Sequence, residues 1–141
     1  MHGTDIDTLA RLPLLRGCNR RQLMLVARLT TAIEVPPDRV LCEQGEPGQH
    51  FYVLLKGRAA VLRDGRLIAL LGRGDWFGEL AFTSDEQVRT ATVKAVTGST
   101  VLVFGRVGYR TLLDACPQAA ARIAERAAAR GATHEAATLV S

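Results

Sequence analysis

Short apolar runs separated by glycine turns fill the middle of this chain. Between Thr30 and Phe104 the runs are four to seven residues long and rich in Val, Leu and Ile, and turn signals such as Gly45-Glu46-Pro47-Gly48 and Asp64-Gly65 interrupt them. Runs of this kind predict β-strands, and many short strands at regular spacing are typical of a barrel or of two rolled sheets. We therefore expect an antiparallel β-roll, a double-sheet jelly roll, over residues 30–105.

The turns divide this region into seven expected strands. Gly57 separates two runs and Asp64-Gly65 separates the next pair, and both turns predict hairpins. The expected strands are Thr30–Val35, Arg39–Cys42, Phe51–Lys56, Ala59–Arg63, Leu67–Leu71, Thr90–Val96 and Thr100–Phe104.

Helices are expected on both sides of the roll. Residues 1–29 hold two: one capped by Thr4 or Asp5 and interrupted by Pro13, and one capped by Asn19. Residues 106–131 hold the C-terminal pair, over Val107–Ala115 and Gln118–Arg130.

Gly131 is about 1 kcal/mol less favourable than Ala inside a helix, so the last helix either ends there or continues weakly to Leu139. We divide the chain at this glycine and assign residues 132–141 to a tail. The expected class is α+β, with a β-roll flanked by N-terminal and C-terminal helices. At 141 residues the chain suits one domain with one substantial core.

Composition excludes several classes of function. The formal net charge is +4, but no run of like charges exceeds Arg20-Arg21, so a generally basic surface is favoured over a nucleic-acid site. No apolar stretch approaches the roughly 20 residues that span a bilayer, and no direct membrane insertion is expected. The N-terminus has no apolar segment of the signal-peptide type.

The cysteines and histidines do not form a metal or catalytic pattern. Cys18, Cys42 and Cys116 are widely spaced and lack a Cys-x-x-Cys pair, so we expect no zinc but free, reduced thiols in a cytoplasmic protein. His2, His50 and His134 form no His-x-His pattern, which argues against a metal-dependent enzyme on a similar roll. No Gly-x-Ser-x-Gly occurs, and no enzymatic activity is expected.

One pair of segments carries the chemistry. Phe77-Gly78-Glu79-Leu80-Ala81-Phe82 is followed, across a short polar loop, by Arg89-Thr90-Ala91. The first backbone N–H groups of a helical turn after Gly78 have no internal partner and suit a phosphate. An ionised Glu79 accepts hydrogen bonds from hydroxyls, and Arg89 offers a fork of donors to an anion. Together these groups suit a ribose and its phosphate.

Each of these groups also has a structural explanation. Glu79 serves equally as a surface residue at a helix start, and Arg89 as a surface partner of Asp85 or Glu86. Thr90 is a good strand residue without any ligand. The joint occurrence inside a glycine-punctuated β array is what favours a binding site.

These segments resemble the phosphate-binding cassette of the cyclic nucleotide-binding domains of the catabolite-activator and protein-kinase regulatory-subunit superfamily. That cassette reads Phe-Gly-Glu-apolar-Ala-apolar, a loop, then Arg-Ser/Thr/Ala-Ala, and residues 77–91 match it. The similarity extends to Phe51–Gly57, Leu70–Asp75 and the segment from Leu112 to Pro117.

The resemblance implies a site and a ligand. Glu79 would bind the ribose 2′-OH and Arg89 the cyclic phosphate, and the remaining ligand-binding residues would be Gly78, Leu80, Ala81, Thr90 and Ala91. The ligand is expected to be cAMP, with cGMP as the alternative, and no other cofactor. The base-contacting zone of the last helix would fall at His134 and Glu135, behind Gly131.

The resemblance also implies a function. We expect a standalone sensing module, without a DNA-binding domain, whose terminal helices change position when the nucleotide binds and signal through a partner protein. The alternatives are a protein-interaction domain on the same fold that has lost its ligand, or the excised sensor of a larger regulator or channel. An Ala-rich last helix with one Ile favours a monomer or a weak homodimer.

Overall fold

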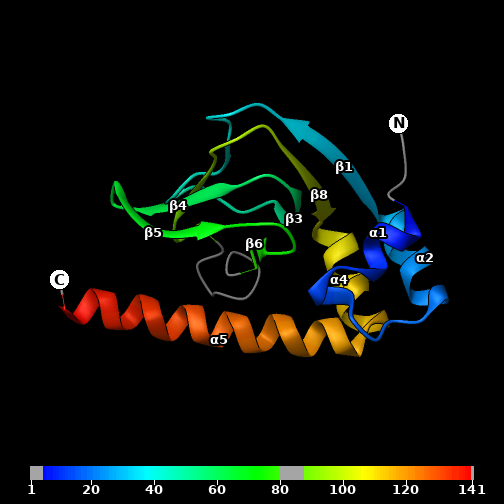
Figure 1. Cartoon of the computed structure of the whole chain (residues 1–141). Helices are drawn as coiled ribbons and strands as arrows, with labels where there is room; N and C mark the ends of the chain where they lie inside the picture. Colours follow the sequence, from blue (N-terminus) through cyan, green and yellow to red (C-terminus); the bar gives the residue numbers. More distant parts are fainter. Residues whose placement is uncertain (1–4, 80–87, 141) are drawn as a thin grey trace.

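The computed structural model describes residues 5–79 and 88–140, with side chains as far as Ala129. Two antiparallel four-stranded sheets form a roll, with helices at one end and along one side (Figure 1). The first sheet has the order β1 (Thr30–Val35), β8 (Ser99–Gly105), β3 (His50–Lys56) and β6 (Trp76–Phe77). The second has the order β2 (Val40–Cys42), β7 (Thr92–Ala95), β4 (Ala59–Arg63) and β5 (Arg66–Leu71). The expected fold class, an α+β protein built on a double-sheet β-roll, is confirmed.

The hairpin at Asp64-Gly65 is confirmed. Arg63 pairs with Arg66 across the turn, and both turn residues have positive φ, 53° for Asp64 and 78° for Gly65. Positive φ at both central residues is the requirement of the two-residue hairpin turn that matches strand twist.

The hairpin expected at Gly57 is wrong. β3 and β4 lie in different sheets, so the chain at Gly57 crosses between sheets instead of folding back on itself. β3 pairs with β8 and β6, whereas β4 pairs with β5 and β7. Gly57 has a φ of 99°, and a Cβ there would lie 2.2 Å from the Ser99 hydroxyl, so the glycine serves a close crossing. A second difference is β6, a two-residue strand that the sequence pattern did not reveal.

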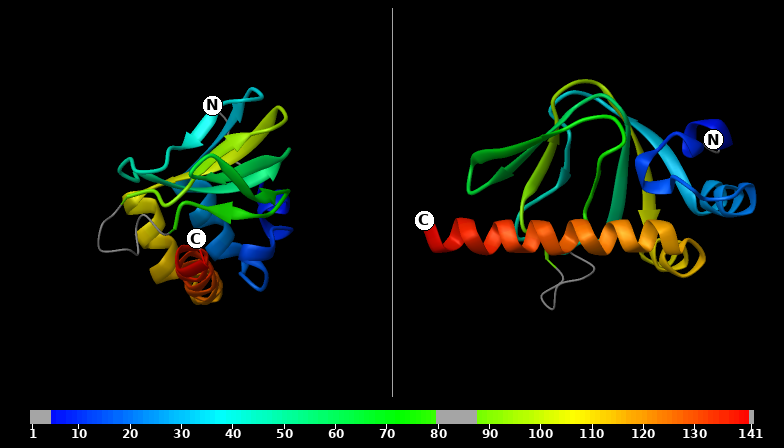
Figure 2. Two further views of the ribbon diagram at one scale, coloured as in Figure 1. Left: turned by 90° about the vertical axis from the view of Figure 1, so that its left-hand side faces the viewer. Right: turned by 60° about the horizontal axis from the view of Figure 1, so that its bottom comes forward.

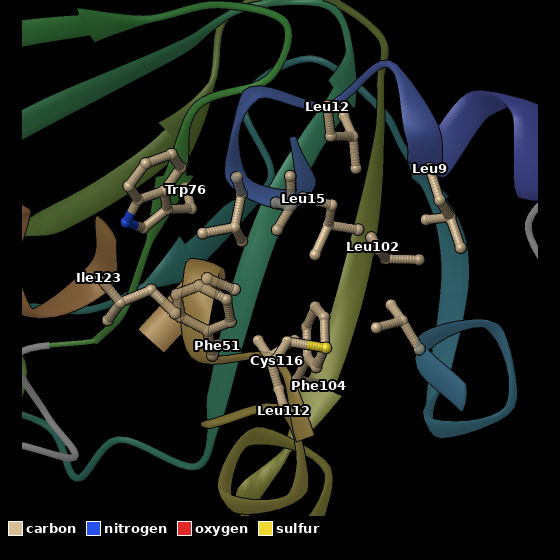
Figure 3. Packing of buried hydrophobic residues seen from close by; sticks show 14 of the residues in the cluster. Leu9, Leu12, Leu15, Phe51, Trp76, Leu102, Phe104, Leu112, Cys116 and Ile123 are labelled. Atoms are coloured by element: carbon tan, nitrogen blue, oxygen red, sulfur yellow. The ribbon is translucent and has the colours of Figure 1, made fainter. Parts of the chain in front are cut away.

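The two middle strands of the first sheet, β8 and β3, are buried on both faces, which explains why β3 is apolar at nearly every position. Phe51 and Val53 face the helices, and Tyr52 and Leu54 face the second sheet, because successive strand residues point to opposite sides. The chain consequently has two cores. The larger one lies between the first sheet and the helices, where Phe51, Leu102 and Phe104 meet Leu112 and Ile123 (Figure 3).

The N-terminal helices begin at their expected caps. Asp5 caps α1 (Ile6–Ala10), and Asn19 and Gln22 form a reciprocal capping box at α2 (Arg20–Leu29). Pro13 does more than interrupt a helix, because it opens a 3-10 turn, η1 (Pro13–Leu15), whose two leucines are buried. That turn packs against the C-terminal helix that begins at Pro117.

The C-terminal helices are α4 (Arg106–Ala115) and α5 (Pro117–Val140). α5 does not end at Gly131, so the expected tail is helical as far as Val140. One glycine costs about 1 kcal/mol, and the Ala residues around it are the best helix formers, so the helix continues. α5 runs along one side of the roll (Figure 2), and its Arg126 lies against the ring of Trp76 in β6.

Candidate functional site

A cavity of about 510 Å³ opens between the second sheet, the end of β6 and α5. Its wall combines charged residues with aliphatic side chains, and several of the aliphatic ones come from the β4–β5 hairpin. The lining residues that matter for ligand chemistry are Val61, Arg63, Ile68, Leu70, Asp75, Gly78, Glu79, Arg89, Thr90, Ala91 and Arg126. The cavity thus gathers residues from β2, β4, β5, β6, β7 and α5, which are spread along the chain from Cys42 to Ala129.

Glu79 and Arg89, the two residues expected to bind ribose and phosphate, line this same cavity. Both side chains are withdrawn from bulk water: Glu79 is 0% exposed and Arg89 is 7% exposed. Neither occupies the surface position that the structural explanation requires. A carboxylate and a guanidinium at one buried site can bind a hydroxyl and an anion together.

Backbone carbonyl groups hold the guanidinium of Arg89. Its Nη1 donates to the Gly78 carbonyl at 3.0 Å and its Nη2 donates to the His50 carbonyl at 2.7 Å. The main chain of Arg89 is also fixed, because its N–H donates to Glu46 and its carbonyl accepts from Gly45, both at 2.8 Å. The side chain therefore has a defined position, with no carboxylate partner among the described residues.

Gly78 permits this arrangement. Its φ of 98° is a conformation that other residues rarely adopt, and a Cβ would lie 2.8 Å from Nη1 of Arg89 and 2.9 Å from the His50 carbonyl. The backbone at Gly78 therefore approaches the arginine more closely than any side chain would allow.

Other expected site residues are placed as follows. Thr90 and Ala91 line the cavity, at the approach to β7. Leu80 and Ala81 lie outside the described residues, and so do the side chains of His134 and Glu135, although both belong to the backbone of α5.

Sequence reasoning missed the residues that complete the wall. Arg63 lies two positions after Val61 on β4, so strand alternation places both on one face and offered a signal for Arg63. No local sequence pattern pointed to Arg126. It reaches the cavity because α5 passes the roll, and its guanidinium lies 4.9 Å from the centre of the Trp76 ring.

A thiol and a phenol near Glu79 have raised pKa values. Burial raises the pKa of the Cys42 thiol to about 11, and the charge of Glu79 adds to the effect while Arg89 opposes it. Burial raises the pKa of Tyr109 to about 12, again with a contribution from Glu79. These shifts indicate a poorly hydrated environment, in which interactions with charged groups are strengthened.

The described part of the chain contains no group of three or more His, Cys, Asp or Glu residues that could hold a metal ion. Within the same residues, no helix has the length and apolar character needed to cross a membrane.

Comparison with known proteins identifies relatives of this chain. The family model for the cyclic nucleotide-binding domain matches residues 32–116. The cAMP-dependent protein kinase regulatory subunit of Emericella nidulans is 34% identical over 107 residues, which cover 74% of this chain and 26% of that protein. A cyclic nucleotide-gated potassium channel of Rhizobium etli is 31% identical over 121 residues, covering 86% of this chain and 34% of the channel.

A similar fold is also found among solved structures. The crystal structure of the Thermus thermophilus catabolite activator protein superposes with a TM-score of 0.76 at 28% identity, covering 91% of this chain and 62% of that one. The chain spans only about a quarter to a third of the length of the two curated relatives.

Proposed function

The chain belongs to the cyclic nucleotide-binding domain family, and we propose that it is a regulatory module that binds a cyclic nucleotide in the cavity beside α5. The observation that carries this proposal is the convergence of Glu79 and Arg89, both buried, on one cavity of about 510 Å³. Glu79 accepts the ribose 2′-OH, and Arg89 donates to the cyclic phosphate. Thr90 and the N–H groups near Leu80, Ala81 and Ala91 complete the phosphate site.

Arg89 is prepared for an anion. Two carbonyl groups hold its guanidinium at 2.7 Å and 3.0 Å, which fixes its plane before a ligand arrives. A guanidinium has five donors, so donors remain after two are engaged. Little side-chain entropy is then lost when the phosphate binds.

The names of the relatives support cAMP, since the fungal protein is named a cAMP-dependent kinase regulatory subunit. cGMP carries the same ribose and cyclic phosphate, so it is proposed as a ligand of the same cavity. No chemical step is assigned to the site, which we propose to be a binding site and not a catalytic one.

We propose that the output is a change in the position of α5. This helix contributes Arg126 to the cavity wall, so a ligand in the cavity contacts it directly. A partner protein that contacts α4 and α5 then senses the change. The free cysteines Cys18, Cys42 and Cys116 support a cytoplasmic location for this exchange.

Titration calorimetry with cAMP and with cGMP tests the site. We expect Arg89→Ala to weaken binding by about 2–5 kcal/mol, which is roughly 30- to 4,000-fold, because a buried phosphate loses its ionic partner. Glu79→Gln should also weaken binding, since the amide is a poorer acceptor for the ribose hydroxyl.

Arg73→Ala is the matched control, because it removes one arginine from an exposed position outside the cavity wall. Thermal melting of each variant separates lost binding from lost folding. Wild-type protein that binds neither nucleotide would support the protein-interaction domain instead. Equal affinities of wild type and a folded Arg89→Ala variant would remove the proposed site.

A further inference from the structure

The apolar part of the cavity wall has the character of a surface for a flat base. Val61, Ile68 and Leu70 supply apolar wall on the β4–β5 hairpin, and the exposed fractions of Ile68 and Leu70 are 46% and 56%. Such half-exposed aliphatic side chains lose contact with water when a flat ring covers them. The polar groups beside them then decide which base is preferred.

Arg63 is the polar group on that wall that the phosphate and ribose do not need. It is half-buried on β4, and its Nε donates to the Thr90 carbonyl at 3.4 Å, which directs the guanidinium toward the cavity. Within the described part of the chain, its two terminal nitrogens have no hydrogen-bond partner. They are donors held at a cavity wall.

The two acidic side chains of the wall each have another interaction or role. Asp75 accepts a hydrogen bond from the Gly72 N–H at 2.7 Å, and Glu79 is the acceptor for the ribose. Arg89 is held by two backbone carbonyl groups, and Arg126, the third arginine of the wall, has its guanidinium over the Trp76 ring. Among the three arginines of the described wall, Arg63 is therefore the one whose terminal donors remain for a base.

Purine bases differ in what they present to such a donor. Guanine offers O6 and N7 as adjacent acceptors, and a guanidinium fork binds both at once. Adenine has N7 next to a 6-amino group, which is itself a donor and repels the second N–H. We infer that Arg63 selects the base. The cavity then prefers a cyclic nucleotide with a 6-oxopurine, such as cGMP, over cAMP. This inference rests on the proposed function.

The test is calorimetric titration of the whole chain with cAMP, cGMP and inosine 3′,5′-cyclic monophosphate (cIMP). cIMP has O6 and N7 but lacks the 2-amino group of guanine. A bidentate contact of this kind discriminates by about 1–3 kcal/mol, so cGMP and cIMP should each bind about 5- to 140-fold more tightly than cAMP. Arg63→Leu should bring all three affinities together, and Arg63→Lys should keep only part of the preference.

Arg66→Leu is the matched control. Arg66 faces Arg63 across the same hairpin, carries the same charge and is exposed, but it does not line the cavity. It should leave the ratios between the three nucleotides unchanged. Because Arg63 could also attract the phosphate, the informative quantity is the ratio of affinities, which a general electrostatic effect does not alter.

The outcomes are distinct. A wild-type preference for cAMP, or a cGMP preference that survives Arg63→Leu in folded protein, overturns the inference and leaves the proposed function standing. A preference for cGMP that cIMP does not share also overturns it, because the 2-amino group is then being read. Absence of binding by all three nucleotides overturns the proposed function and the inference with it.

Discussion

Gly78 and Arg89 are matched to each other at the atomic scale. The glycine has a left-handed backbone, and its carbonyl accepts from the arginine at 3.0 Å. The approach is close enough that any side chain at this position would meet the guanidinium. Glycine is thus required at position 78 for two reasons, its positive φ and its close contact with Arg89.

We expect Gly78→Ala to lower the free energy of unfolding by about 1–3 kcal/mol, because of strained backbone and steric overlap. It should also weaken nucleotide binding, since Arg89 must move. Urea unfolding and calorimetric titration measure the two effects.

Gly65→Ala is the control, because it introduces backbone strain like Gly78→Ala but no steric overlap. Gly65 also has positive φ, at 78°, but a Cβ there meets nothing within 4 Å. This control should lower stability by about 1–2 kcal/mol and leave binding unchanged. If both variants bind nucleotide like wild type, the contact between Gly78 and Arg89 has no part in the site.

At the scale of elements, α5 is attached to the N-terminal region by side chains from its first turns. Arg122 donates from Nη1 to the carbonyl groups of Leu14 and Arg16, at 2.9 Å and 2.7 Å. Gln118 donates to the Gly17 carbonyl at 3.0 Å. The turn opened by Pro13 is therefore a docking point for the helix that borders the cavity.

Arg122→Ala should lower stability by about 1–2 kcal/mol, because two carbonyl groups lose a charged donor while part of that loss is replaced by water. Hydrogen exchange of amides in the first turns of α5 should become faster than in wild type. Arg110→Ala is the control, since Arg110 is an exposed arginine on α4. Unchanged exchange in Arg122→Ala would show that these hydrogen bonds do not hold the helix.

At the scale of the whole molecule, both cores contain weak acids that folding keeps neutral. Cys42 lies in the core between the sheets, and Tyr109 and Cys116 lie in the core under the helices. Burial is the largest cause of the raised pKa in each case, to about 11 for both thiols and about 12 for the phenol. The stability of both cores should therefore depend on pH in the same direction.

We expect stability to fall as the pH rises above 9. Between pH 9 and 11 an unfolded Cys42 thiol ionises while the folded one keeps its proton, so high pH favours unfolding. The loss is about 2–3 kcal/mol for this thiol when the folded pKa is reached, and Tyr109 extends the decline toward pH 12.

Urea unfolding from pH 8 to 11 measures this decline. Cys42→Ala should show a shallower slope against pH, whatever its stability at pH 8. A variant slope equal to that of wild type would mean that Cys42 ionises equally in the folded and unfolded states.

Local chemistry in the sequence was enough to predict seven of the eight strands that the structure describes, the helix caps, the hairpin at Asp64-Gly65 and the convergence of Glu79 and Arg89 on one cavity. These features depend on residues close together in the chain, where φ preferences, alternation and capping act directly. The same reasoning failed at Gly57, where two adjacent strands join different sheets.

Long-range packing decided the rest. β3 pairs with β8 because its two apolar faces need the helices on one side and the second sheet on the other, which no local pattern specifies. Arg63 and Arg126 enter the cavity for the same reason, since strand pairing and the course of α5 bring them there. The residues proposed to hold ribose and phosphate follow one another in a single sequence motif, whereas the other residues of the cavity wall depend on how distant elements pack.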